Sequence, residues 1–180
     1  MIEAQHSVEE YLNTSYEPDM EFADGELIAR NVGAPTHSLL QVIIGTYFHN
    51  LRKAYPRLMV LPAARLKISP QRYRIPDVMI LEFPCIPGRF VTDVPAVVIE
   101  ILSPEDRFGQ FLAKCREYLA FNILNIIVID PDARRTYRFG ASGLLYDSVP
   151  VLRFPKSAIE LPFPVHEMFA EIDADLSWED

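Results

Sequence analysis

The chain has few cysteines and no long run of apolar residues. Its 180 residues include only two cysteines, Cys85 and Cys115, which form neither a disulfide framework nor a zinc-binding pattern. No apolar stretch approaches the roughly 18 residues that a membrane-spanning helix needs. The first residues, 1–6, lack the basic region and apolar block of a signal peptide. We therefore expect a cytoplasmic protein with reduced cysteines and no association with membranes.

The sequence also has fewer basic than acidic residues. The sequence has 17 lysine and arginine residues against 25 aspartate and glutamate residues, which gives a net charge of −8. Avid, non-specific binding of nucleic acid depends on many basic side chains that neutralise phosphates, so this balance argues against it. It does not exclude a nuclease, because the acidic residues can lie on the far face and a bound metal ion supplies local positive charge.

Glycine is scarce as well. The seven glycines do not form the glycine-rich loop that cradles phosphates in nucleotide-binding proteins, so a hydrolase of small phosphoesters is the weakest function that we consider. With 49% hydrophobic and 23% charged residues, the composition is that of an ordinary globular protein. Because there is no internal repeat and no break in composition, we expect a single domain over residues 1–180, with an acidic tail at about 173–180.

The spacing of the apolar residues predicts an α/β (α+β) domain, in which a mixed β-sheet is flanked by helices and accessory β-hairpins. Asp24-Gly25 indicates a tight turn between two strands. The segment 96–129 is typical of a strand, a helix and a parallel strand in a right-handed crossover, with Cys115 buried on the helix and Asn122 ending it in a left-handed conformation. We predict helices from Ser7 and at 37–54, 106–121 and 164–170, strands at 20–28, 58–61, 64–68, 73–83, 96–102, 126–130, 134–139 and 144–147, and a proline-rich loop at 84–95.

Two acidic residues stand in strands that otherwise have the composition of a core. Asp77 follows Pro76 at the start of one apolar run, and Glu100 closes another, Ala96-Val97-Val98-Ile99-Glu100. A buried charge is costly because it loses its hydration, and two neighbouring carboxylates repel each other unless a cation lies between them. With Lys114 on the following helix, a divalent metal ion between the two acids would give the outline of a phosphodiester-cleaving site.

Each of these three residues also has a simpler interpretation. Asp77 could cap backbone amides in a turn at a strand edge, and Lys114 taken alone is most often a solvated lysine on a helix. Glu100 could form a structural salt bridge with an arginine. Glu100 is the hardest to explain without a partner, because apolar residues surround it in the sequence.

Further short motifs accompany these residues in a fixed order, namely Asp24-Gly25-Glu26-Leu27, His37, Pro76-Asp77-Val78, Glu100-Ile101-Leu102-Ser103-Pro104, Lys114, Tyr118 and Val128-Ile129-Asp130-Pro131. The ordered set resembles the Uma-type family of putative restriction endonucleases, within the PD-(D/E)XK nuclease superfamily. The resemblance implies a restriction-endonuclease-like fold, with Asp77 as the first metal-binding aspartate and Glu100 as the second acid. It further implies that the carbonyl of Ile101 joins the metal, and that Lys114 replaces the superfamily's usual lysine, whose position is occupied by Leu102.

Several polar residues near these motifs are secondary candidates. Glu26 is either an acid on the surface of its hairpin or an added metal ligand. His37 either caps the start of its helix or contacts a phosphate near the metal, and Gln41 lies one helical turn further along the same face. The basic residues upstream of Asp77 form either a solvated strand face or a groove that holds the DNA backbone, and they are Arg65, Lys67, Arg72 and Arg74.

The first hypothesis is therefore a Mg²⁺-dependent endodeoxyribonuclease, for which Mn²⁺ is a plausible substitute ion. Asp77, Glu100 and the carbonyl of Ile101 would bind the metal, and Lys114 would assist the attacking water. DNA is the expected partner, and cutting both strands suggests a homodimer with two active sites. The alternative, motivated by the net negative charge and by Leu102, is a catalytically degenerate nuclease fold that binds nucleic acid or protein.

Overall fold

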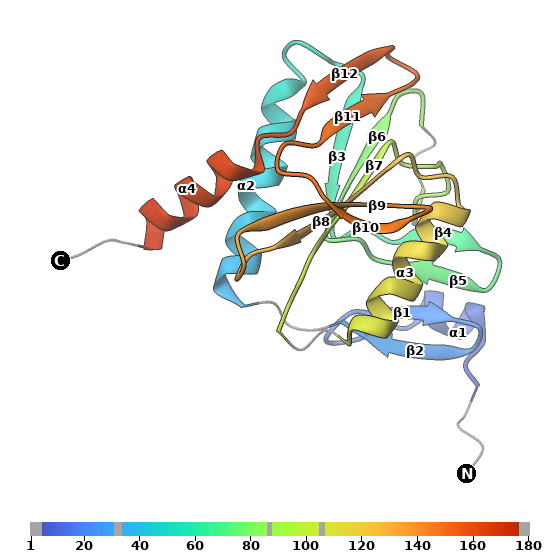
Figure 1. Cartoon of the computed structure of the whole chain (residues 1–180). Coiled ribbons are helices and arrows are strands. Elements are labelled where there is room, and N and C mark those ends of the chain that lie inside the picture. The colour runs from blue at the N-terminus through green and yellow to red at the C-terminus, as the bar shows by residue number, and fades with distance from the viewer. Residues whose placement is uncertain (1–4, 31–33, 86–87, 105–106, 177–180) are drawn as a thin grey trace.

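The computed structural model describes residues 5–30, 34–85, 88–104 and 107–176. Figure 1 shows a central six-stranded sheet, a smaller four-stranded sheet beside it, and helices packed around both. The helices of the described residues are α1 (Val8–Asn13), α2 (Pro35–Leu51), α3 (Phe108–Ala120) and α4 (Val165–Leu176). None of these helices has the length and apolarity that are needed to cross a membrane. The strands of the same residues are β1 (Met20–Ala23), β2 (Glu26–Ala29), β3 (Leu58–Pro62), β4 (Leu66–Ser69), β5 (Arg72–Arg74), β6 (Val78–Glu82), β7 (Val97–Ile101), β8 (Asn125–Asp130), β9 (Arg135–Gly140), β10 (Gly143–Tyr146), β11 (Val151–Phe154) and β12 (Ile159–Pro162).

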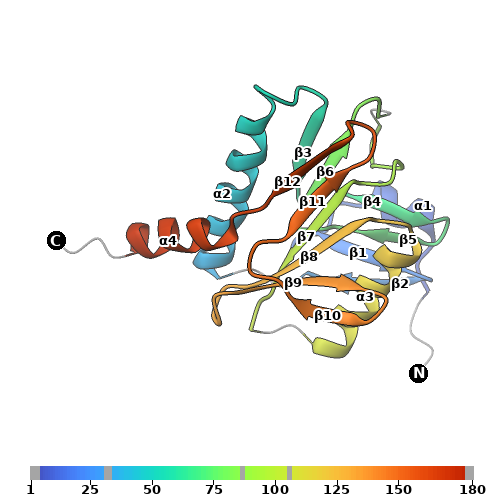
Figure 2. The ribbon, with the colours of Figure 1, turned by 45° about the horizontal axis from the view of Figure 1, so that its top comes forward.

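The central sheet has the strand order β10-β9-β8-β7-β6-β3. Strands β7 and β8 are parallel and are connected through α3, whereas the other neighbouring strands are antiparallel. Every residue of β6 and β7 is buried, because α2 and α4 cover one face of the sheet and α3 covers the other (Figure 2). The predicted mixed sheet, and the parallel strand–helix–strand unit at 96–129, are confirmed.

Alternation along β7 decides which side chains face which helix. Ile99 and Ile101 belong to the apolar cluster on the α2 side, while Val98 belongs to the cluster under α3. Successive side chains of a strand point to opposite faces of the sheet, so Glu100 shares the face of Val98. The acid therefore points toward α3, which carries Lys114.

The smaller sheet has the strand order β2-β1-β5-β4, and an aromatic cluster of Tyr11, Phe22 and Tyr73 packs α1 against it. The predicted turn at Asp24-Gly25 joins β1 to β2. Both turn residues have a positive φ, 52° and 97° respectively, which suits a two-residue hairpin turn. Strands β1, β2 and β5 contribute one wall of a polar pocket.

The prediction of a single strand at 73–83 is wrong. The chain forms β5 in the smaller sheet and β6 in the central sheet, with Ile75, Pro76 and Asp77 between them. Proline has no N–H group to donate to a strand ladder, and the N–H of Ile75 donates to the side chain of Glu21 instead of to a strand. Asp77 therefore lies at the junction of the two sheets.

Helix boundaries also differ slightly from the prediction. α2 begins at Pro35 rather than at residue 37, because proline suits the first turn of a helix. His37 consequently lies within that turn. At the end of α3, Asn122 has a φ of 65°, and Cys115 is buried, so both of these predictions are confirmed.

The C-terminal part contains more structure than the sequence predicted. The hairpin of β11 and β12 has no counterpart among the predicted strands, and α4 continues to Leu176, so the first residues of the acidic tail are helical. The remainder of that tail, 177–180, lies outside the described residues, as do Asp106 and residues 86–87 of the proline-rich loop.

Candidate active site

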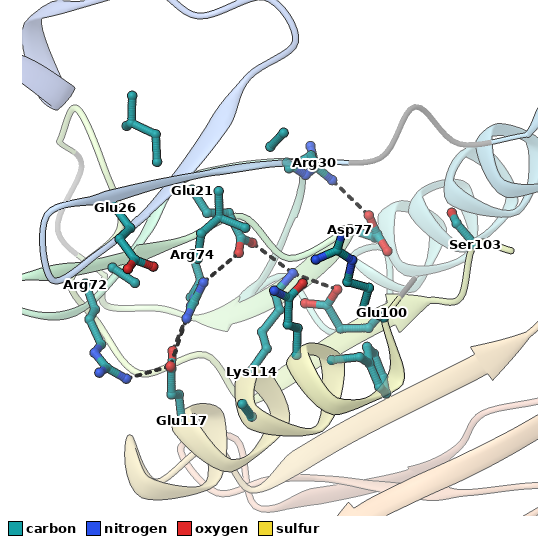
Figure 3. A pocket seen from close by; sticks show the side chains of 18 of the residues that line it. Glu21, Glu26, Arg30, Arg72, Arg74, Asp77, Glu100, Ser103, Lys114 and Glu117 are labelled. Atoms are coloured by element: carbon teal, nitrogen blue, oxygen red, sulfur yellow. Dashed lines mark hydrogen bonds and ion pairs between the residues drawn. The ribbon is translucent and has the colours of Figure 1, made fainter. Parts of the chain in front are cut away.

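A polar pocket of about 1100 Å³ opens where the central sheet, the smaller sheet and α3 meet. Figure 3 shows the hairpin of β1 and β2 along one side of this pocket and α3 along the other. Three residues singled out in the sequence line it together, and they are Asp77, Glu100 and Lys114. They come from different elements, because Asp77 directly precedes β6, Glu100 lies on β7 and Lys114 lies on α3.

The carboxylate of Asp77 is buried and fixed by three donors. Its Oδ1 atom lies 2.9 Å from Arg30 Nη2, while Oδ2 lies 3.2 Å from His37 Nε2 and accepts a 2.8 Å hydrogen bond from the backbone N–H of Ile101. The side-chain amide of Gln41 donates to the main-chain carbonyl of Asp77 at 2.7 Å. Helix α2 thus supplies two of the secondary candidates, and both hold Asp77 in place.

These contacts control the protonation of Asp77 and His37. Burial raises the pKa of Asp77, but the hydrogen bond from His37 and the charge of Lys114 outweigh it, so the pKa lies below its usual value. Burial lowers the pKa of His37, but Asp77 outweighs that effect and the pKa lies above its usual value. The geometry therefore favours a carboxylate next to an imidazolium.

The negative charge of Glu100 is less well compensated than that of Asp77. Its Oε1 atom accepts a 2.6 Å hydrogen bond from the hydroxyl of Tyr118, and Oε2 lies 2.9 Å from Lys114 Nζ. Burial is the main cause that raises the pKa of Glu100 to about 7, and the neighbouring charges of Asp77 and Glu21 add to it, while Lys114 opposes them. Glu100 is thus a carboxylate that lacks enough positive charge around it.

Lys114 carries a partly buried ammonium group, which lies between two carboxylates. Its Nζ atom lies 2.8 Å from Glu21 Oε1 and 2.9 Å from Glu100 Oε2. Burial lowers the pKa of Lys114, but these two carboxylates raise it above the usual lysine value. The side chain is therefore charged, and it is not the solvated helix lysine of the simpler interpretation.

Glu21 is an acid of the pocket that the sequence reasoning missed, as it also missed Glu117. It lies on β1, is 4% exposed, and accepts hydrogen bonds from the N–H of Ile75 at 2.9 Å and from Arg74 Nη1 at 3.0 Å, in addition to its contact with Lys114. Burial raises the pKa of Glu21, but Lys114 and Arg74 outweigh it and lower the pKa. The signal that could have found it is the one used for Glu100, namely an acid inside an otherwise apolar strand, Met20-Glu21-Phe22-Ala23.

A chain of alternating charges extends from Lys114 along the pocket (Figure 3). Beyond Glu21, Arg74 donates to both carboxylate oxygens of Glu117, at 2.7 and 2.8 Å. Arg72 donates to Glu117 at 2.6 Å and also pairs with Asp24 at the hairpin turn. These pairs tie the smaller sheet to α3.

The four basic residues of the predicted DNA-backbone groove do not lie together. Arg72 and Arg74 line the pocket, where both are paired with acids. Arg65 pairs with Asp19 at 2.7 Å, and Lys67 lies over the rings of Tyr73 and Phe90. Neither of the two basic residues lines the pocket. Their role in binding the DNA backbone stays a prediction. Glu26 lines the pocket from the exposed start of β2.

The chain matches a protein family over residues 8–170, which is most of its length. This family is Uma2, and its description is "Putative restriction endonuclease". The chain belongs to the Uma2 family. The match confirms the resemblance that the sequence motifs indicated.

A solved structure has the same fold as this Uma2 family member. It is a crystal structure at 1.96 Å resolution from Anabaena variabilis ATCC 29413, described as that of "a putative nuclease belonging to DUF820". The TM-score is 0.75 at 17% sequence identity, and the likeness covers 91% of this chain and 99% of that chain. It confirms the predicted fold class. No curated protein matches the chain.

The donor chemistry of this Uma2 family member fits a hard divalent cation. In the described part of the chain, no three His, Cys, Asp or Glu side chains form a cluster that could hold a metal ion by themselves. Mg²⁺, however, keeps several water ligands and is usually bound through one or two carboxylates. Asp77 and Glu100 line the same pocket, and burial together with the charge of Asp77 raises the pKa of Glu100, so a cation beside Glu100 would stabilise its charged form.

Proposed function

We propose that this Uma2 family member is a Mg²⁺-dependent endodeoxyribonuclease, with Mn²⁺ as a substitute ion. The observation that carries the proposal is the meeting of two buried carboxylates, Asp77 and Glu100, with the partly buried ammonium of Lys114 in one pocket. Two buried acids beside a lysine could together hold a metal ion and place an ammonium next to it, and such an ion can assist phosphodiester hydrolysis. Membership of a family described as "Putative restriction endonuclease" supports the same activity.

Each residue has a defined task in this proposal. Asp77, Glu100 and the carbonyl of Ile101 would hold the metal ion, which when bound acidifies a water molecule and neutralises charge on the attacked phosphate. Arg30 and His37 fix the Asp77 carboxylate before any ligand arrives, so little reorganisation is needed. Lys114 would orient the attacking water or stabilise the charge that develops on the phosphate oxygens.

Contacts with the DNA backbone belong at the rim of the pocket. Arg72 is the best placed of the four basic candidates, because it lines the pocket and its side chain is 36% exposed. Arg74 is 7% exposed and is held by two glutamates, which suits a supporting role instead. Cleavage of both strands of a duplex would call for two such sites, and hence for a homodimer.

The second candidate function is a catalytically degenerate nuclease fold that binds nucleic acid or protein. The observation in its favour is that Glu100 already has two partners, Lys114 and Tyr118, so that the charges form a network without a metal ion. Calorimetric titration with Mn²⁺ separates the two functions. A nuclease binds the ion and loses this binding in Asp77→Asn, whereas a binding module shows no specific heat of binding.

Cleavage of plasmid and branched DNA in Mg²⁺ or Mn²⁺ tests the first proposal directly. Asp77→Asn and Glu100→Gln are expected to lower the rate by more than roughly 100-fold, the upper range for residues that merely support a metal ligand. Glu82→Gln is the matched control, because Glu82 is also a buried glutamate but lies outside the pocket. If folded wild-type protein cleaves no form of DNA with either ion, the proposal is wrong.

A further inference from the structure

Lys114 has two carboxylate partners, and they lie on opposite walls of the pocket. Glu21 reaches its ammonium from β1 in the smaller sheet, and Glu100 reaches it from β7 in the central sheet. Figure 3 shows Lys114 between the two acids. Of these two acids, only Glu100 is proposed to hold the metal ion. Ion binding would therefore weaken the contact of Lys114 with Glu100 and leave its contact with Glu21.

The two partners are anchored very differently. The carboxylate of Glu21 accepts hydrogen bonds from the backbone N–H of Ile75 and from Arg74, which is itself held by Glu117. The N–H of Ile75 belongs to the backbone between β5 and β6, so it stays in place when side chains rotate. The hydrogen bond from this N–H therefore fixes the carboxylate of Glu21. Glu100 is held by two side chains, those of Tyr118 and Lys114, and its carboxylate can turn.

A cation between Asp77 and Glu100 would compete with Lys114 for the Glu100 carboxylate. It would coordinate oxygen atoms of Glu100, and its positive charge would repel the nearby ammonium. Without a second anion, the lysine would be driven away from the reacting phosphate. Glu21 is placed to prevent this, because it approaches Lys114 from the side away from Glu100.

We propose that Glu21 is the positioning residue of the site, which keeps the Lys114 ammonium in the pocket when Glu100 turns to a bound cation. This inference rests on the proposed function for the role of Lys114 in cleavage. The contact itself does not depend on it, since Glu21 Oε1 lies 2.8 Å from Lys114 Nζ in this structure.

Glu21→Gln tests the inference, with Glu82→Gln as its matched control. Glu82 is 3% exposed and accepts hydrogen bonds from the backbone N–H groups of Lys156 and Ser157, so it resembles Glu21 in burial and backbone contacts but lies outside the pocket. Three quantities are measured for each variant: kcat and KM for DNA cleavage in Mn²⁺, the Kd for Mn²⁺ by calorimetry, and the rate at which an acid anhydride acylates Lys114, read by mass spectrometry.

The expected result is a loss in kcat on the order of 10²-fold for Glu21→Gln, which is the cost of a misplaced catalytic group. Its KM and its Mn²⁺ affinity should change by less than about threefold, since a group that acts only in the transition state leaves ground-state binding intact. Acylation of Lys114 should be several-fold faster than in wild type. Glu82→Gln should leave all three quantities unchanged.

The inference is overturned if Glu21→Gln retains the kcat of the control, or if it loses Mn²⁺ affinity in proportion to kcat. If Glu21→Gln does not fold, Glu21→Asp keeps the charge but withdraws the carboxylate by one methylene, and the same loss of kcat is expected. If wild-type protein proves not to cleave DNA, the proposed function fails and the acylation rate decides alone. Faster acylation of Lys114 in the Glu21 variant then supports the positioning contact, and an unchanged rate refutes it.

Discussion

At the scale of single residues, the candidate site is a group of buried charges that differ in how well they are compensated. Asp77 has Arg30, His37 and a backbone N–H around it, and its pKa is lowered, whereas burial raises the pKa of Glu100 to about 7. Lys114 is shared between Glu100 and Glu21. Glu100 is therefore the residue whose environment would improve most on binding a cation.

The hydroxyl of Tyr118 should be important for stability, because it is the neutral donor that helps to keep Glu100 ionised in the core. At pH 8, Tyr118→Phe is expected to lower the free energy of unfolding by about 1.5–3 kcal/mol, the range for hydrogen bonds to charged groups. Tyr47→Phe is the matched control, since the hydroxyl of Tyr47 donates to the carbonyl of Pro162 in an exposed position. Urea denaturation measures both, and an equal or smaller loss for Tyr118→Phe would contradict the compensation of Glu100.

The two cysteines should differ in reactivity. Burial raises the pKa of the Cys115 thiol to about 12, so almost none of it is thiolate at pH 8, while Cys85 is partly exposed. Because the thiolate is the reactive form, we expect iodoacetamide to modify Cys85 in the folded protein and to modify Cys115 only after denaturation. Modification of Cys115 under native conditions would show that α3 does not pack as described.

At the scale of elements, the site depends on local periodicities in β7 and α3 and on the pairing of β1 with β5. The alternation of β7 turns Glu100 toward α3, and helical spacing places Lys114 and Tyr118 one turn apart on that helix, so that both contact Glu100. The contact between Glu100 and Lys114 follows from these local periodicities, so the sequence could predict it. The sequence placed Asp77 with them as the second acid of the pair and through the resemblance to the nuclease family. Their catalytic and metal-binding roles remain predictions.

What the sequence did not predict depends on how separate elements dock. Glu21 becomes part of the site only because β1 pairs with β5 and brings it next to Arg74. The strand predicted at 73–83 failed for a related reason, since its apolar pattern continues across Pro76 although the chain changes sheet there. A local pattern contains no information on which sheet a strand joins.

The hairpin of β1 and β2 should be sensitive to the residue at its turn, because the hairpin forms a wall of the pocket. Gly25 has a φ of 97°, so Gly25→Ala is expected to destabilise the protein by about 1 kcal/mol or more. Gly45 lies inside α2, and a Cβ atom there meets nothing within 4 Å. Gly45→Ala should therefore stabilise the protein by roughly 0.5–1 kcal/mol. Thermal unfolding of the two variants should shift in opposite directions, and a shift of the same sign would contradict this assignment of the turn.

At the scale of the whole molecule, the charge distribution limits how DNA can be held. The chain has a net charge of −8, and four of the cations that line the pocket, Arg30, Arg72, Arg74 and Lys114, are engaged with carboxylates. We therefore expect DNA to be held by specific contacts in the pocket, together with a cation from solution, and not by broad attraction of the protein surface to phosphates. This agrees with the proposal that the site depends on a metal ion.

The salt dependence of DNA binding should reflect this charge distribution. If about three pocket cations contact phosphates, the slope of log K against log salt concentration should be near −3, since each neutralised phosphate contributes about −0.9. Fluorescence anisotropy with Glu100→Gln, which should bind but not cleave DNA, measures this slope. A slope steeper than about −6 would show that basic residues outside the pocket, such as Arg65 and Lys67, form a larger DNA-binding surface.

Anomalous diffraction from a crystal soaked in Mn²⁺ would show whether Asp77 and Glu100 hold a divalent ion. We expect one strong peak about 2.1 Å from oxygen atoms of both residues, with Lys114 still in contact with Glu21. A peak only at another place, or no peak in this pocket at a saturating concentration of the ion, would refute the proposed metal site.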